Sequence, residues 1–301
     1  MTGGAGNRLI PYDEFGYFHE NAAEFGLPYD GPPEVRRTAV DVGDGRTLSA
    51  LVWGGGAPEL VLIHGGGQNA HTWDTVAMAL RRPLIAVDLP GHGHSDTARG
   101  SSVDVRTNAP EVAAVIRALA PDAKAVVGMS LGGMTTLALI EHAPELVRRA
   151  VLVDVTPGVN AAKSKTISDF INGPASFADF DELLARTIEY NPTRTVSSLR
   201  RGILHNAEQR SDGSWVWRYR RLTDQPGHPD FGALWDVVSS ARVPLLLVRG
   251  MREQSVVDDA DEREFLRRGA DARVERVAEA GHSVQGDTPV ELAALINAFA
   301  P

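Results

Sequence analysis

The sequence predicts an α/β fold: a mostly parallel, eight-stranded sheet flanked by helices, with a helical cap inserted after the sixth strand. Three observations predict this fold. Short apolar runs alternate with helical patterns along most of the chain, which is typical of a doubly wound sheet. The later runs consist almost wholly of Val, Leu and Ile, as expected for parallel strands buried on both faces. The alternation stops between Pro157 and Arg242 and then resumes, which indicates an insertion.

Eight runs are candidate strands. The first two are separated by Gly43-Asp44-Gly45, a hairpin signal, so we expect the sheet to begin with an antiparallel pair. In chain order the expected strands are Thr38–Val42, Leu48–Trp53, Leu60–His64, Leu84–Leu89, Ala125–Met129, Ala150–Val155, Leu245–Arg249 and Arg273–Val277. The helices expected beside them are His71–Arg81, Val103–Ala120, Leu131–His142, Asp258–Arg268 and Pro289–Phe299.

The chain is expected to divide into three parts. Residues 1–35 form an aromatic lead-in, residues 36–156 and 242–301 form the core domain, and residues 157–241 form the cap. Helical patterns and three of the five tryptophans mark the cap: Asp181–Tyr190, Val196–His205, Trp215, Trp217 and Trp235. Because ligands of open α/β sheets bind beyond the carboxyl ends of the strands, we expect the cap to line a substrate pocket there. Core packing explains the tryptophans equally well.

Composition limits the classes of function. The 301 residues are 43% hydrophobic, enough for one large α/β domain or for a core with a cap. The net charge is −9, from 30 basic and 39 acidic residues without a basic block, which argues against a nucleic-acid partner. The absence of cysteine excludes disulfides and a thiolate nucleophile. We find no secretory leader and no stretch long enough to span a membrane, so a cytoplasmic protein is the expectation. The sequence leaves the oligomeric state open.

The strongest motif is a candidate nucleophile. Residues 128–132 read Gly-Met-Ser-Leu-Gly between a strand pattern and a helix pattern, which is the context of a G-x-S-x-G nucleophile elbow. The tight turn leaves no room for Cβ atoms two residues to either side of the serine. We expect Ser130 to stand at the carboxyl edge of the sheet, above a helix N-terminus that favours negative charge. The alternative is an ordinary strand-to-helix turn.

A serine hydroxyl attacks well only when a base removes its proton. The chain has nine histidines, and His282 lies in a loop between the last expected strand and the last expected helix. That loop also projects from the carboxyl edge of the sheet. The chain order, serine first and histidine late, favours His282 as general base and then general acid over a plain surface histidine.

Two carboxylates compete to orient this base. Glu253 follows the strand at residues 244–250, and its segment could also be a plain polar loop. Asp154 closes an apolar strand, where a carboxylate needs a partner to offset its desolvation, although it could serve only to cap nearby amides. The residues favour Asp154 slightly, and both assignments stay open.

A glycine-rich loop is the candidate oxyanion hole. His64-Gly-Gly-Gly67 follows an apolar strand, and we expect the backbone amides of Gly66 and Leu131 to bind the developing oxyanion. A phosphate loop is disfavoured because no Lys-Ser/Thr follows and no G-x-G-x-x-G spacing is present. The residues expected to line the substrate pocket are Gly67, Gln68, Asn69, Trp73 and Met129.

Two further histidines lie in Asp88-Leu-Pro-Gly-His-Gly-His-Ser95. His92 and His94 could in principle bind a metal, but no third ligand is evident. We therefore expect no metal site, and we expect these side chains to orient the loop by hydrogen bonds.

Taken together, these motifs resemble the α/β-hydrolase fold superfamily over roughly residues 36–301. The resemblance implies a cofactor-free enzyme of the esterase-like branch, which cleaves a small-molecule carboxylic ester or related acyl substrate through an acyl-Ser130 intermediate. It also makes the loop that holds Glu253 the commoner position of the acid. Serine at the elbow argues against the dehalogenases and epoxide hydrolases of this fold, which carry aspartate there. The alternative functions are carbon–carbon bond cleavage, lyase or perhydrolase chemistry and, least favoured, a ligand-binding receptor without turnover.

Overall fold

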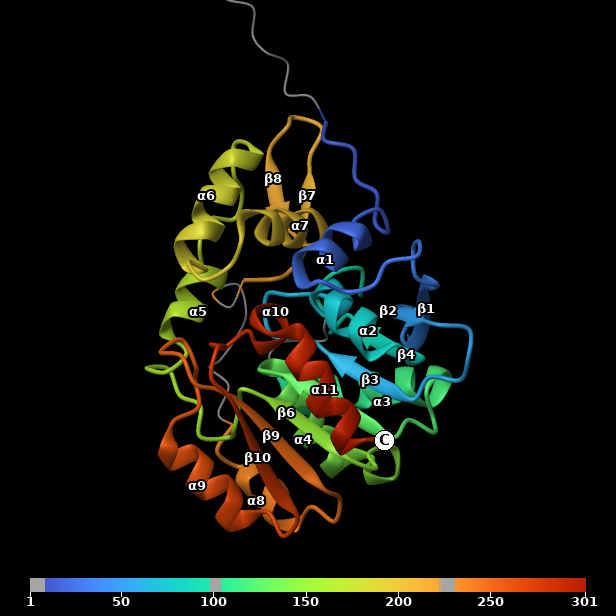
Figure 1. Cartoon of the computed structure of the whole chain (residues 1–301), viewed down its shortest axis with the longest axis vertical. Helices are drawn as coiled ribbons and strands as arrows, with labels where there is room; N and C mark the ends of the chain where they lie inside the picture. The colour runs from blue at the N-terminus through green and yellow to red at the C-terminus, as the bar shows by residue number, and fades with distance from the viewer. Residues whose placement is uncertain (1–8, 98–103, 222, 224–230) are drawn as a thin grey trace, which may run out of the picture.

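A computed structural model describes residues 9–97, 104–221, 223 and 231–301. Its centre is an eight-stranded sheet with the strand order β1-β2-β4-β3-β5-β6-β9-β10 (Figure 1). β1 pairs with β2 and β2 with β4 in antiparallel fashion, and the other neighbours are parallel. The strands are β1 (Val35–Gly43), β2 (Arg46–Trp53), β3 (Leu60–Ile63), β4 (Leu84–Val87), β5 (Ala125–Met129), β6 (Ala150–Val153), β9 (Leu245–Gly250) and β10 (Ala272–Val277). The predicted fold class is confirmed.

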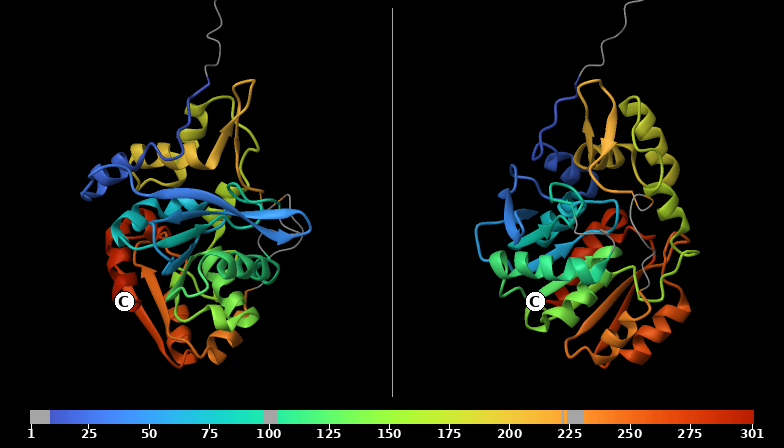
Figure 2. Two further views of the ribbon diagram at one scale, coloured as in Figure 1. Left: turned by 90° about the vertical axis from the view of Figure 1, so that its right-hand side faces the viewer. Right: turned by 180° about the vertical axis from the view of Figure 1, so that it is seen from behind.

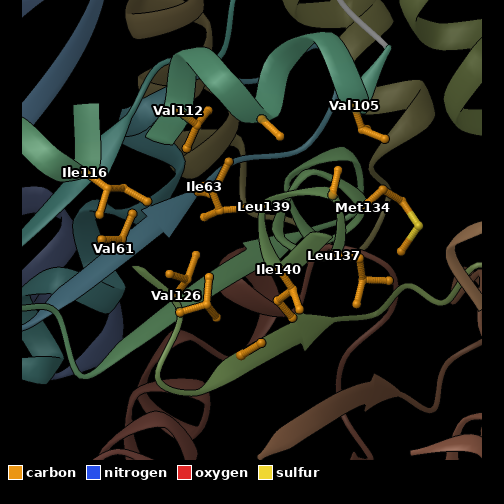
Figure 3. Close-up of a cluster of buried hydrophobic side chains, with 14 of the residues drawn as sticks. Val61, Ile63, Val105, Val112, Ile116, Val126, Met134, Leu137, Leu139 and Ile140 are labelled. Carbon is orange, nitrogen blue, oxygen red and sulfur yellow. The ribbon is translucent and has the colours of Figure 1, made fainter. Parts of the chain in front are cut away.

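Helices cover both faces of the sheet because alternate side chains of each buried strand point to opposite faces. In β3, Val61 and Ile63 enter one hydrophobic cluster, whereas Leu60 and Leu62 enter the other. Figure 3 shows the first cluster, where side chains of α3 and α4 pack on β3 and β5. The helices on this face are α3 (Val105–Leu119), α4 (Leu131–His142), α8 (Leu234–Ser240) and α9 (Asp259–Arg268).

The opposite face is covered by helices from both ends of the chain and from the segment between β3 and β4. Its helices are α1 (Phe18–Phe25), η1 (Ala70–Trp73), α2 (Asp74–Leu80), α10 (Val284–Asp287) and α11 (Pro289–Phe299). The helix expected at His71–Arg81 begins with the 3₁₀ turn η1 and continues as α2. The helix expected from Val103 begins at Val105, after the N-cap residue Asp104, and Val103 itself lies outside the described residues.

A second, smaller layer lies over one end of the sheet domain (Figures 1 and 2). It has its own hydrophobic cluster, which includes Leu183, Ile203 and Trp215. We call it the cap. Its elements are α5 (Lys165–Ile171), α6 (Phe180–Tyr190), α7 (Val196–Asn206), β7 (Ala207–Gln209) and β8 (Trp215–Trp217), and the short η2 (Pro144–Leu146) precedes it in the core.

Two details of the expected cap differ from the structure. The cap, expected to be helical, also contains the β7–β8 hairpin, on which Trp215 and Trp217 lie. α8 and Trp235 pack against α4 in the core cluster, so the segment 157–241 includes a helix that belongs with the sheet. The sequence could not reveal this because α8 is apolar on one face whichever layer it joins. The wider division into lead-in, core and cap remains a prediction.

Candidate active site

Ser130 occupies a strained turn between β5 and α4. Its φ of 50° and ψ of −117° fall in a region that side-chain-bearing residues rarely adopt. The turn brings backbones into contact: a Cβ on Gly128 would lie 2.3 Å from the Gly132 carbonyl oxygen, and a Cβ on Gly132 would lie 2.2 Å from that of Ile63. Only glycine fits at these two positions, as the elbow motif requires.

His282 and Asp154 form a buried hydrogen-bonded pair. Asp154 follows β6 and His282 follows β10, so both lie at the same carboxyl edge of the sheet as Ser130. Nδ1 of His282 lies 2.9 Å from Oδ2 of Asp154. The other ring nitrogen, Nε2, is buried and has no hydrogen-bond partner among the described residues. Ser130 and His282 line the same cavity, so Nε2 is the nitrogen available to a group that enters there.

The Asp154 carboxylate is completely buried but well satisfied. Its Oδ1 accepts hydrogen bonds from the Gly250 amide at 2.9 Å and from the Ser255 hydroxyl at 2.6 Å. Its Oδ2 accepts one from the Val256 amide at 3.1 Å, in addition to that from His282. These donors stabilise the ionised carboxylate and fix its direction.

Glu253, the competing acid, lies at the same edge but points elsewhere. Its side chain is exposed, and its Oε1 accepts a hydrogen bond from the side-chain Nε2 of Gln254 at 3.3 Å. It lines an outer cavity that His282 also reaches, yet within the described chain it makes no hydrogen bond to that ring. The structure thus brings Asp154, and not Glu253, to His282.

Two buried imidazoles hold the glycine-rich loop after β3. Nε2 of His64 accepts a hydrogen bond from the Leu89 amide at 2.9 Å, and its Nδ1 lies 2.7 Å from the Gly65 carbonyl oxygen. Nε2 of His92 accepts one from the Gly67 amide at 3.2 Å. Burial lowers the pKa of His92 to about 3, with the nearby His64 contributing, so the ring stays neutral and its Nε2 can accept. His92 thus orients the glycine-rich loop. Its Nδ1 lies 3.1 Å from the Pro90 carbonyl oxygen, in the loop that the sequence predicted it would orient.

The two expected oxyanion donors are the backbone amides of Gly66 and Leu131. In the described part of the chain, neither the Gly66 N–H nor the Leu131 N–H has a hydrogen-bond acceptor. Leu131 begins α4, where the first amides of a helix lack intrahelical partners. Two unpaired donors beside the Ser130 hydroxyl, in the same cavity, suit a negatively charged oxygen.

The cavity that contains Ser130 has walls from both layers. Gly67, Gln68 and Met129 line it, as expected. Trp73 does not: it is completely buried in the core beneath α2, because the 3₁₀ turn directs the indole toward the sheet. Asn69 lines the neighbouring inner cavity instead. The sequence analysis expected the cap to line a pocket but named none of the lining residues, although Ile167, Phe170 and Ile171 have helical spacing on α5. The cap residues on the cavity wall are Thr166, Ile167, Phe170, Ile171, Tyr190 and Asn191.

One group of side chains in the inner cavity could hold a metal ion. His71, Asp74 and His205 are buried and offer ligand atoms within 4.8 Å of one another. Burial disfavours the charged form of His71, but Asp74 and Glu14 outweigh it and raise its pKa to about 9, so the ring is protonated at neutral pH. The two imidazoles stack with centroids 3.9 Å apart and planes 12° apart. A metal ion could bind both rings only after His71 lost its proton and one ring turned.

The sheet, the elbow and the buried acid–base pair define the α/β-hydrolase class. The profile of the Alpha/beta hydrolase family matches residues 60–295, and the chain belongs to this family. It is similar to the esterase Rv0045c of Mycobacterium tuberculosis, with 44% identity over 299 residues that cover 96% of each chain. A solved structure of that esterase, from work on its transition metal inhibition and structural refinement, matches with a TM-score of 0.85 and 42% identity, covering 96% of this chain and 99% of the other.

A shorter part of the chain is similar to another esterase. A pimeloyl-[acyl-carrier protein] methyl ester esterase of Nitrosomonas europaea is 40% identical over 105 residues, which are 34% of this chain and 39% of the relative. Within the described residues, none of the helices combines the length and apolar character needed to cross a membrane.

Proposed function

We propose that this protein is a serine hydrolase that cleaves carboxylic esters through an acyl intermediate on Ser130. The observation that carries the proposal is the cavity shared by Ser130 and by an imidazole whose other nitrogen is tied to a buried carboxylate. The similarity to an esterase over nearly the whole chain supports it.

In the first half of the reaction, Ser130 Oγ attacks the ester carbonyl while Nε2 of His282 takes the hydroxyl proton. Asp154 holds the ring in the tautomer with a proton on Nδ1 and stabilises the imidazolium that forms. The amides of Gly66 and Leu131 donate hydrogen bonds to the oxyanion, which is worth several kcal/mol in such sites. His282 then gives its proton to the leaving alkoxide, and the alcohol departs.

Water completes the cycle. His282 Nε2 takes a proton from a water molecule, whose oxygen attacks the acyl-Ser130 carbonyl. Collapse of the second tetrahedral intermediate releases the carboxylic acid and returns the proton to Ser130. The apolar side chains of Met129, Ile167 and Ile171 suit the hydrocarbon part of a small-molecule ester.

The proposal is tested by labelling the protein with a fluorophosphonate and identifying the modified residue by mass spectrometry. We expect one adduct, on Ser130, and hydrolysis of p-nitrophenyl butyrate that the label abolishes. Ser130→Ala should lose both, and its thermal melting should stay close to that of the parent. Hydrolysis that survives in Ser130→Ala would refute the mechanism. Cell fractionation would test the expected cytoplasmic location.

A further inference from the structure

Arg194 lies in the turn between α6 and α7, one residue before Thr195, the N-cap of α7. It lines the inner cavity beside the one that contains Ser130. Gln68, Phe170 and Asn191 line both cavities, so the two adjoin. A substrate that reaches Ser130 can therefore extend toward the Arg194 guanidinium.

Among the described residues, the Arg194 guanidinium has no carboxylate partner. Its side-chain hydrogen bond goes from Nη2 to the Ser198 hydroxyl, and no carboxylate of the described residues lies within 4.0 Å of it. The carboxylates of Asp287 and Glu24 interact with the Arg194 guanidinium only through longer-range electrostatic attraction. By contrast, Arg201 lines the same cavity and forms ion pairs with Glu24 and Glu20.

Arg194 is only partly exposed, and desolvation lowers the pKa of its guanidinium, because an unpaired cation is costly where contact with water is reduced. The planar guanidinium fork matches the two oxygens of a carboxylate better than any other side chain does. A ligand carboxylate in the inner cavity would supply the charge that the protein itself leaves out. His71 also lines this cavity, but its positive charge is already paired with the Asp74 carboxylate.

We propose that Arg194 binds a carboxylate carried by the substrate, so that the enzyme prefers esters whose acyl or alcohol part ends in a carboxylate. This inference rests on the esterase function proposed above. The carboxylate would anchor the end of the substrate remote from Ser130, and the ester bond would then lie beside the nucleophile.

A packing role for Arg194 makes a different prediction. A Cβ on Gly286 would lie 1.9 Å from Nη1 of Arg194, so the guanidinium also covers α10, the helix after His282. If that contact were its whole role, its loss would disturb His282 and slow every substrate alike. A carboxylate-binding role lowers kcat/KM selectively, through KM.

The experiment compares mono-p-nitrophenyl esters of succinic, adipic and suberic acids with neutral p-nitrophenyl esters of the same chain length. We expect the parent enzyme to favour one of the acidic esters. Arg194→Met should lower this preference by on the order of tenfold to a hundredfold, the value of a charge-assisted hydrogen bond, and Arg194→Lys should restore part of it. Arg200→Met is the matched control, because Arg200 is a half-exposed neighbour on α7 and should leave the preference unchanged. A second set of substrates, acetate esters of hydroxy acids, carries the carboxylate on the alcohol part of the ester.

The inference would be overturned if the parent enzyme preferred acidic esters in neither substrate set. It would also be overturned if Arg194→Met lowered kcat/KM equally for acidic and neutral esters. Free adipate supplies a readout that needs no turnover: it should raise the melting temperature of the parent and of Ser130→Ala, but not that of Arg194→Met. Absence of any adipate effect on the parent would count against the carboxylate site. Failure of both acidic and neutral esters to react would instead count against the esterase function.

Discussion

Oδ2 of Asp154 lies 2.9 Å from Nδ1 of His282, although the two residues are 128 positions apart in the chain. β9 separates their strands in the sheet, and its last residue, Gly250, donates its amide to the same carboxylate. A Cβ on Gly250 would lie 2.2 Å from the Gly281 carbonyl oxygen, so glycine is needed where the loop before His282 crosses the strand end. The backbone of the intervening strand thus fixes both partners.

Asp154→Asn should lower kcat for p-nitrophenyl esters by on the order of 10⁴-fold, because the amide cannot favour the Nδ1-protonated tautomer and cannot stabilise the imidazolium. Steady-state kinetics measures the change. The matched control is Glu253→Gln, which alters an exposed carboxylate at the same edge of the sheet and should change kcat less than about threefold. A large loss in Glu253→Gln with little loss in Asp154→Asn would reverse the assignment of the acid.

Two helical glycines offer a matched test of the elbow's close packing. Gly132→Ala places a methyl group against the Ile63 carbonyl oxygen, which belongs to a buried strand and cannot move freely. It should cost about 1–3 kcal/mol or more of unfolding free energy and most of the activity. Gly202→Ala in α7 meets nothing within 4 Å and should stabilise the protein by about 0.5–1 kcal/mol. Urea denaturation measures both, and equal effects would contradict the packing argument.

The sequence was informative where local chemistry determines structure. The glycines around Ser130 are required by backbone contacts that the turn itself creates, so the motif could be recognised without coordinates. The choice between Asp154 and Glu253 could not be made in this way. Both follow neighbouring strands of the sheet, and only the direction of each side chain separates a buried, hydrogen-bonded carboxylate from an exposed one.

The cap was the least predictable part. Arg194 and Asn191 stand in a turn whose composition resembles any polar loop, and their place on a cavity wall depends on how the cap packs on the sheet. Trp73 shows the converse error: its position after the glycine-rich loop suggested a pocket residue, but a 3₁₀ turn buries it. Long-range packing decided each of these outcomes.

His92→Ala should weaken the glycine-rich loop and make the stability of the protein less sensitive to mild acid. The neutral ring of His92 accepts a hydrogen bond from the Gly67 N–H. Loss of this hydrogen bond should lower kcat by about tenfold, while an ester substrate still binds. The pKa of His92 falls to about 3 in the folded protein, against about 6.5 when unfolded. Its contribution to unfolding free energy is therefore fully present above about pH 6.5 and declines as the pH falls toward 3. Urea titrations of both proteins over this range should converge in acid, and a constant difference would contradict the assignment.

His71 should show the opposite pH dependence. Its pKa is raised to about 9 because Asp74 and Glu14 outweigh the effect of burial, whereas the unfolded value is about 6.5. The folded protein therefore holds a proton that the unfolded chain releases between these pH values. The stabilisation is complete below about pH 6.5 and is lost as the pH rises through 9. His71→Asn should thus be less stable than the parent by a few kcal/mol near pH 6, and the gap should narrow by pH 9.5. Chemical denaturation at a series of pH values measures the gap, and a gap that widens with pH would show that His71 is neutral in the folded protein.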